Sequence, residues 1–159
     1  MNSFLPSNQL LTFLTFWEAP GGVPVTTAYL DQAGVPTIGY GHVAGVQIGD
    51  TCTADQAWQW LNDETGHSMT AACPMVTYQM QQNEADAIGS FAFNVGTNGF
   101  AGSSILANMN RGRFDLAAPV FLLWDKVRIN GILTVDPGVL KRRQAEQAIF
   151  SNADYSLRP

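Results

Sequence analysis

The stretch YLDQAGVPTIGYGH, residues 29–42, is the part of the sequence that decides the fold. β-Branched and aromatic residues alternate there with glycines, and a proline interrupts the run. This pattern is typical of two short strands joined by a tight turn. The same composition extends over about residues 25–50. We therefore predict a small antiparallel sheet in this segment.

The segments on both sides of the predicted sheet have helical spacing. Ser7 precedes apolar residues three or four positions apart, which predicts a helix over residues 7–18 with Ser7 as its N-cap. Two prolines and two glycines in residues 19–24 end this helix in a loop. Thr53 begins a capping-box pattern and a helix that we expect to stop near Gly66. Further helices are predicted over about residues 81–95, 103–110, 115–127 and 138–150.

The size and composition of the chain favour one compact domain. It has 159 residues, of which 46% are hydrophobic and 13% charged. The expected fold class is α+β, with a sheet lobe over about residues 25–50, a helical lobe over about 53–159 and a cleft between them. The apolar runs are far shorter than the roughly 20 residues that span a bilayer, so we expect no membrane insertion.

Charge is divided unevenly along the chain. Residues 1–110 contain eight acidic residues and no Lys or Arg, whereas residues 111–159 contain eight basic and five acidic residues. A chain with a net charge of −5 has no general attraction to nucleic acid, and we expect no such partner. An anionic polymer could still contact the more basic C-terminal part.

The histidines and cysteines do not indicate a metal site. His42 and His67, and likewise Cys52 and Cys73, match no metal-ligand spacing. We therefore predict neither a metal nor a cofactor. Composition alone leaves the cysteines as two buried thiols or as a disulfide formed outside the cytoplasm. The N-terminus lacks the positive region of a secretory signal, so we expect synthesis in the cytoplasm without a signal peptide.

Glu18 and Asp31 are the residues best suited to catalysis. Glu18 follows Phe16 and Trp17 at the end of an apolar helix, where an acid loses hydration and can stay protonated near neutral pH. Asp31 lies in a polar turn, where it should stay ionised. A proton donor and a carboxylate that activates water are the two groups that glycoside hydrolysis needs. The alternative interpretation is a surface acid at a helix end and an ordinary turn residue.

Residues 29–42 resemble the strand-turn-strand signature of the phage-type lysozymes, the endolysins of glycoside hydrolase family 24. Four later segments are also similar to this family, and the resemblance extends from Phe16 to about Phe150. These segments are residues 86–96, 103–112, 124–126 and 137–146. The resemblance implies a lysozyme-like fold in which a small sheet and a larger helical lobe flank a cleft.

The resemblance also implies roles for three residues. Glu18 would be the general acid, and Asp31 and Thr37 would hold the attacking water on the opposite face of the sugar. This is an inverting arrangement. The interval from Glu18 to Asp31 is longer than is usual in the family. We place the extra residues in the loop Ala19–Val25, where they would reshape the rim of the cleft.

Four further positions receive weaker assignments. Asn94 resembles an amide of the cleft that binds an N-acetyl sugar, although a polar residue near a helix end is the alternative. Arg142 and Arg143 are candidate substrate-binding residues that could reach Glu18 from the last helix, or they could face solvent. His42 is predicted to have a structural role, in packing or in an ion pair.

The cysteine pairing is also an expectation from the resemblance. It puts Cys52 at the start of one helix and Cys73 near a following bend. A packed helical hairpin could bring the two thiols together, and we predict a disulfide between them once the protein has left the cytoplasm.

The function that the resemblance implies is that of a muramidase. It would hydrolyse the β-1,4 bond between N-acetylmuramic acid and N-acetylglucosamine in peptidoglycan strands. We expect a monomeric phage endolysin that acts in the periplasm, is released by a holin and lyses the bacterium. The same domain could serve as a bacteriocin or contact-delivered effector countered by an immunity protein. A lytic transglycosylase would not need Asp31 and Thr37, and a non-catalytic glycan-binding module would not need either acid.

Overall fold

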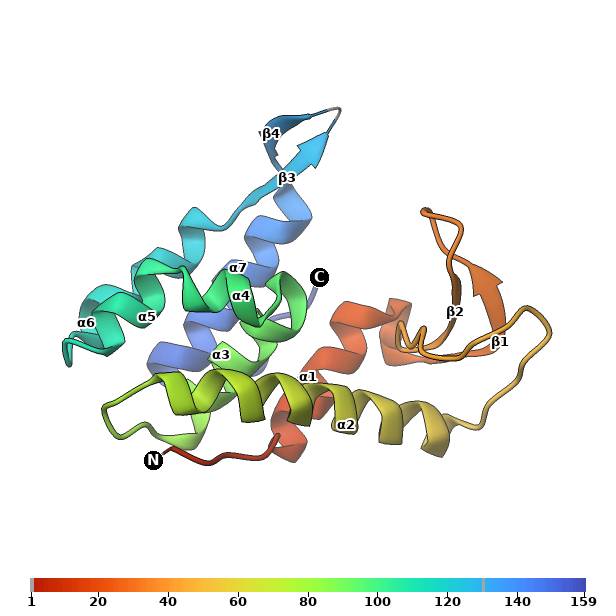
Figure 1. Ribbon diagram of the computed structural model, residues 1–159, viewed down its shortest axis with the longest axis horizontal. Coiled ribbons are helices and arrows are strands. Elements are labelled where there is room, and N and C mark those ends of the chain that lie inside the picture. Colours follow the sequence, from red (N-terminus) through yellow and green to blue (C-terminus); the bar gives the residue numbers. More distant parts are fainter. Residues whose placement is uncertain (1, 130) are drawn as a thin grey trace.

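The computed structural model describes residues 2–129 and 131–159. Its longest helix, α2 (Ala54–Ala72), runs beneath two lobes (Figure 1). One lobe contains strands β1 (Val25–Leu30) and β2 (Pro36–Gly39), and the other contains most of the helices. Helix α1 (Asn8–Glu18) lies between the lobes, above the middle of α2. The predicted α+β arrangement of a small sheet beside a helical lobe is confirmed.

The sheet lobe forms where the strand-turn-strand pattern predicts it. Strands β1 and β2 pair antiparallel, with Tyr29 opposite Thr37, and the chain turns between them at residues 31–35. Gly39 has a φ of +68°, and a Cβ there would lie 3.1 Å from the Cβ of Ala57 in α2. A glycine at this position therefore lets β2 pack closely on the long helix.

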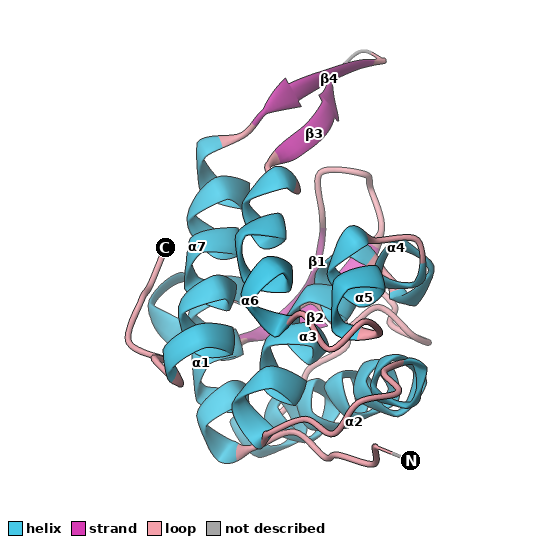
Figure 2. Ribbon diagram, turned by 90° about the vertical axis from the view of Figure 1, so that its left-hand side faces the viewer, coloured by secondary structure: helices cyan, strands magenta, loops and turns pink. Residues whose placement is uncertain are grey.

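The helical lobe is built around α3 (Gln82–Val95), in which every residue from Ala85 to Ala92 is buried. Helix α7 (Pro137–Asn152) packs along it, as Figure 2 shows from the side of this lobe. The remaining helices are short: α4 (Thr97–Ala101), α5 (Ser104–Met109) and α6 (Phe114–Ala117), with 3₁₀ turns at Pro20–Gly22, Cys73–Met75 and Ala118–Leu123. In the described residues, no helix combines the length and the hydropathy needed to cross a bilayer.

Two of the predicted helices differ from the structure. The helix that was expected to stop near Gly66 continues to Ala72, because buried Thr65 and Met69 keep its inner face packed on the core. The helix predicted over residues 115–127 is wrong. The chain forms α6 there, followed by a 3₁₀ turn that contains Pro119. The start of a hairpin follows, made of β3 (Lys126–Ile129) and β4 (Ile132–Val135). Both ribbon views show this hairpin projecting from the helical lobe (Figures 1 and 2).

The continuous helix α2 also shows that the predicted disulfide is wrong. Cys52 lies just before α2 and Cys73 directly after it, and both thiols are free. At 1.5 Å per residue, a helix of 19 residues is about 28 Å long. A disulfide requires Cα atoms within about 7 Å. The bend that would have formed a helical hairpin between the cysteines does not exist.

We expect the two thiols to differ in reactivity rather than to pair. Cys73 has no exposed surface, and burial together with the nearby charge of Asp86 raises the pKa of its thiol to about 12. Cys52 is partly exposed. Iodoacetamide should therefore modify Cys52 in the folded protein and Cys73 only after unfolding, as read by peptide mass spectrometry. An intramolecular disulfide in folded, air-oxidised protein would contradict the structure.

Candidate active site

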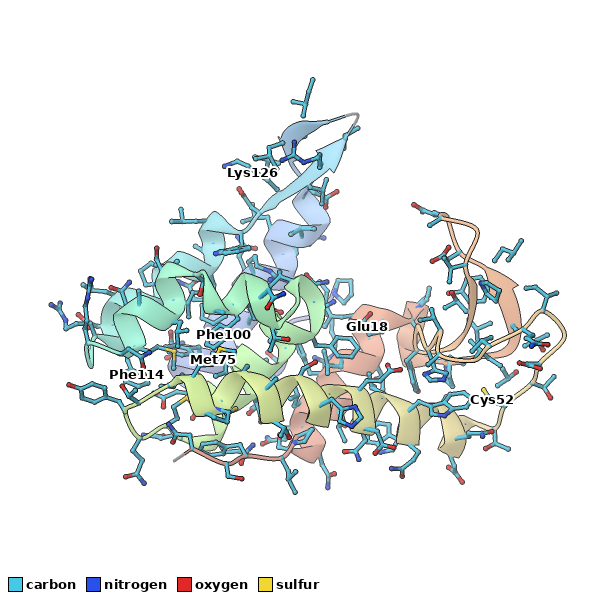
Figure 3. All side chains as sticks on the ribbon, viewed as in Figure 1. Glu18, Cys52, Met75, Phe100, Phe114 and Lys126 are labelled. Carbon is cyan, nitrogen blue, oxygen red and sulfur yellow. The ribbon has the colours of Figure 1, made fainter. Side chains whose placement is uncertain are left out.

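Glu18 is the last residue of α1. The helix begins because the Ser7 side chain accepts a hydrogen bond from the Leu10 amide at 3.0 Å, and it ends before Pro20. Four apolar residues of α1, Leu10, Leu11, Phe13 and Leu14, are buried and fix the helix in the core. The Glu18 side chain is 20% exposed. Figure 3 shows it at the end of α1, between the helical lobe and the sheet lobe.

The loop after Glu18 forms one wall of a pocket. This pocket has a volume of about 440 Å³ and is lined by residues 16–21 together with Arg158 and Pro159. The Arg158 guanidinium lies over the Phe16 ring, 4.5 Å from its centroid. The loop is tied to the sheet lobe, because the Tyr40 hydroxyl donates to the Gly22 carbonyl at 3.1 Å. Residues 19–21 of this loop therefore border the space beside Glu18.

A buried chain of charged side chains extends from Glu18 into the helical lobe. The Glu18 Oε1 atom accepts a hydrogen bond from Arg142 Nη1 at 2.7 Å. Arg142 Nε donates to Glu146 Oε1 at 3.3 Å, and Arg143 Nε lies 3.2 Å from Glu146 Oε2. Arg143 Nη2 donates to Asn94 Oδ1 at 2.6 Å. The chain thus connects Glu18 on α1 with Asn94 at the end of α3.

The burial of the two arginines corrects part of the sequence interpretation. The Arg142 side chain is 7% exposed and that of Arg143 is 0% exposed. The interpretation as solvent-facing residues is wrong, and so is direct sugar binding by Arg143, which no ligand can reach. Arg142 does reach Glu18, as one of the alternatives expected. Arg143 contacts the exposed Asn94 side chain, so it can orient that amide from below.

The electrostatics of this chain are dominated by burial. Desolvation raises the pKa of Glu146, although Arg143, Arg142 and the hydrogen bond from Ser90 oppose it. Desolvation also lowers the pKa of Arg143, while the charge of Glu146 raises it. Two carboxylates and two guanidinium groups balance one another along the chain, which is the condition under which buried charges are tolerated.

Asp31 and Thr37 lie on the opposite lobe from Arg142, around the turn of β1 and β2. The Asp31 Oδ1 atom accepts hydrogen bonds from the amides of Ala33 and Val35, both at 2.8 Å. Within the described residues, Oδ2 accepts none, so it is free to accept a proton. Thr37 is 4% exposed, and its hydroxyl donates to the Val35 carbonyl at 2.9 Å. Thr37 therefore fixes the turn that holds Asp31, and its oxygen can only accept from a water.

His42 makes contacts with α2 through its Nδ1 atom and through its ring. Its Nδ1 atom lies 2.6 Å from Glu64 Oε1, and its ring stacks on Trp60 at 4.3 Å between centroids. Both partners are on α2, so His42 holds the sheet lobe against the long helix. In the described part of the chain, no three His, Cys, Asp or Glu side chains come close enough to hold a metal ion.

The sequence reasoning missed Glu146 and Ser90. Glu146 is 0% exposed and accepts a hydrogen bond from the Ser90 hydroxyl at 2.7 Å. The signal was the spacing in the last helix, where Glu146 follows Arg142 by four residues and Arg143 by three. This spacing puts all three side chains on one face.

Comparison with known proteins agrees with this architecture. The family profile described as Phage lysozyme matches residues 22–146. The endolysin of Acyrthosiphon pisum secondary endosymbiont phage 1 is 38% identical over 126 residues, covering 79% of this chain and 86% of that protein. The endolysin of Salmonella phage P22 is 36% identical over 129 residues, covering 77% of this chain and 84% of that protein.

Solved structures share the fold over nearly the whole chain. The endolysin from Escherichia coli O157:H7 phage FAHEc1 has a TM-score of 0.87 at 29% identity, covering 97% of this chain and 98% of its own. The muramidase domain of SpmX from Asticaccaulis excentricus has a TM-score of 0.83 at 28% identity, covering 92% of this chain and 97% of its own. The sequence match and the common architecture together show that this chain belongs to the phage lysozyme family.

Proposed function

We propose that this lysozyme cleaves the β-1,4 bond between N-acetylmuramic acid and N-acetylglucosamine with Glu18 as general acid. The family match begins at residue 22 and does not include Glu18, so the geometry around this residue carries the assignment. The decisive observation is that a buried arginine of α7 holds the Glu18 carboxyl at 2.7 Å between the two lobes. Glu18 is also the only acid that precedes Asp31 in the sequence.

The proposed reaction is a single displacement at the anomeric carbon. Glu18 gives its proton to the glycosidic oxygen as the bond to the leaving sugar breaks. Asp31 Oδ2 takes a proton from the attacking water, and the oxygen of Thr37 accepts that water's other hydrogen. The backbone amides of Ala33 and Val35 hold Asp31 in place. Attack from the face opposite the leaving group inverts the anomeric centre.

The proposal also includes the biological setting in which the enzyme acts. The similar phage proteins are named endolysins, which supports a role in lysis with peptidoglycan glycan strands as substrate. We propose a monomer that is made in the host cytoplasm, is released by a holin and acts in the periplasm. The similarity to a bacterial muramidase domain favours, as a second candidate, use as a bacteriocin or effector countered by an immunity protein.

The chemistry of the product ends tests the proposed reaction. We expect digestion of purified peptidoglycan to leave reducing ends on N-acetylmuramic acid, because water is the nucleophile. Borohydride reduction of the muropeptides followed by mass spectrometry distinguishes these ends from others. Products that end in 1,6-anhydro-muramic acid would assign the chain to the lytic transglycosylases, and an unchanged sacculus would contradict catalysis altogether.

A further inference from the structure

Glu146 is a buried carboxylate to which the proposed reaction assigns no role. It lies on α7 with no exposed surface, and three side chains point to it. Ser90 of α3 donates to Oε1 at 2.7 Å, Arg142 Nε donates to the same oxygen at 3.3 Å, and Arg143 Nε lies 3.2 Å from Oε2. Burial of an ionised carboxylate at such a point is costly unless it is paired.

The place of Glu146 in the chain of charges gives it an influence on Glu18. Without Glu146, Arg142 would have Glu18 as its only carboxylate partner, and Arg143 would have none. The fully buried Arg143 also lies over the Phe91 ring, 4.9 Å from its centroid. Glu146 therefore fixes both guanidinium groups and supplies one of the two negative charges that balance them.

In the described residues, the charged groups on the elements packed against α7 have other partners. Glu84, in the first turn of α3, accepts a hydrogen bond from the Gln81 amide at 2.7 Å. Asp86, one turn before Ser90 on α3, is bonded to Ser7, Gln82 and Tyr155. The 3₁₀ turn at Ala118–Leu123 contains only apolar residues. On β3, Lys126 lies 3.9 Å from Asp125 and Arg128 donates to the Gly131 carbonyl. On α1, Glu18 is the acid at the other end of the chain.

We propose that Glu146 is a positioning residue that holds Arg142 against Glu18 and sets the charge balance in which Glu18 acts as an acid. This inference rests on the proposed role of Glu18. Glu146 touches no substrate and acts through Arg142. By the same connection it holds Arg143, and through it the Asn94 amide, so the two ends of the chain are oriented by one buried carboxylate.

The variant Glu146→Gln keeps the shape of the side chain and removes its charge. Arg142 would then have Glu18 as its only carboxylate partner, and one negative charge would be missing from the connected group. Both changes favour the ionised form of Glu18, which cannot donate a proton. We expect the alkaline limb of the pH profile of kcat to move down by about 0.5–1 pH unit, so that kcat on that limb falls roughly three- to tenfold. KM should change less, since no sugar contact is removed.

Two further variants test the sign of the shift of the alkaline limb. One should move the limb in the opposite direction, and the other should cancel the shift. Arg143→Met removes one guanidinium, so the alkaline limb should move up in pH. The double variant Glu146→Gln/Arg143→Met removes one charge of each sign and should return the limb close to its wild-type position. The double variant also remains informative if Glu146→Gln alone does not fold. It lacks the Arg143 guanidinium, which would otherwise be a buried charge without a carboxylate partner. Glu146→Asp keeps the charge and should restore most of the profile.

The control is Ile149→Ala, a fully buried position of the same helix that carries no charge. It should lower the thermal stability and leave the pH profile unchanged. The proposal is wrong if Glu146→Gln has the wild-type profile, if Arg143→Met moves the limb in the same direction, or if Ile149→Ala moves it equally.

A second readout needs no catalysis. The titration midpoint of the Glu18 carboxyl, followed by ¹³C NMR and assigned with Glu18→Gln, should move down in Glu146→Gln and up in Arg143→Met. If peptidoglycan were not cleaved, the proposed function would fail while this titration still decided the positioning role. An unchanged midpoint in both variants would overturn the inference even if the enzyme were fully active.

Discussion

Replacing Glu18 with glutamine should lower the rate of peptidoglycan cleavage by about 100- to 10,000-fold, the usual effect of removing a positioned general acid. Glutamine has nearly the same shape, and its carbonyl oxygen can still accept the hydrogen bond from Arg142 that now measures 2.7 Å. It cannot give a proton to the glycosidic oxygen. The loss should therefore fall on kcat, with a much smaller change in KM.

The measurement is the release of soluble muropeptides, with circular dichroism to show that the variant is folded. Asp63→Asn is the matched control, because Asp63 is an exposed acid on α2. Among the described residues, its carboxylate accepts side-chain hydrogen bonds only from Gln59 and Asn62 of the same helix. It should keep full activity. A Glu18→Gln protein that retains more than about a tenth of the wild-type rate would show that another group protonates the leaving oxygen.

The sequence predicted those parts of the fold that depend on local signals. Ser7 and Thr53 cap their helices as expected, and Gly96, with a φ of +83°, ends α3 where predicted. These are contacts within a few residues of one another. The strand pair around residues 29–42 was also recognised, since proline, glycine and β-branched residues restrict the backbone locally.

The errors in the fold arose where tertiary packing overrides a local signal. A glycine inside a helix costs only about 1 kcal/mol, so Gly66 could not stop a helix whose inner face is buried. The helix predicted over residues 115–127 ran into the start of β3, and no strand was predicted over residues 126–135. This segment contains Val127, Ile129, Ile132 and Val135, whose β-branched side chains favour strands. Pro119 gave a further warning, because it interrupts helical hydrogen bonding.

From the sequence alone, the candidate site could be predicted only in part. Glu18 and Asp31 were identified as acids in unlike surroundings, and Arg142 as a residue that could reach Glu18. The connection from Glu18 through Arg142 to Glu146 was not predictable. It requires α7 to lie on α3 with Glu146 facing Ser90. A contact between residues 56 positions apart leaves no periodic signal in a single sequence.

Among substitutions outside the catalytic residues, we expect replacement of Asp86 to lower the free energy of unfolding most. This carboxylate has no exposed surface and joins three parts of the fold. It accepts hydrogen bonds from the Ser7 hydroxyl at 2.5 Å, from Gln82 at 2.9 Å and from the Tyr155 hydroxyl at 2.7 Å. The N-terminus of α1, the first turn of α3 and the segment after α7 therefore meet at one side chain.

We expect Asp86→Ala to lower the free energy of unfolding by about 3–5 kcal/mol, because it leaves several polar groups without their acceptor. In a chain of this size that corresponds to a decrease in Tm of roughly 8–15 °C. Asp86→Asn keeps one oxygen acceptor and should cost less. Tyr155→Phe should cost about 1 kcal/mol, since it removes one hydrogen bond and leaves Asp86 bonded to Ser7 and Gln82.

Urea denaturation of the four single variants and the wild type measures this order of destabilisation. The fourth variant, Asp115→Ala, is the control. Asp115 is exposed, and its ion pair with Arg113 joins two exposed side chains at 3.1 Å, so its removal should leave the free energy of unfolding almost unchanged. The double variant Asp86→Ala/Tyr155→Phe should be less destabilised than the sum of the single variants, because the tyrosine hydroxyl is no longer left without an acceptor. Strict additivity would show that Asp86 and Tyr155 do not depend on each other, and that α1 and the C-terminal segment are held in place independently.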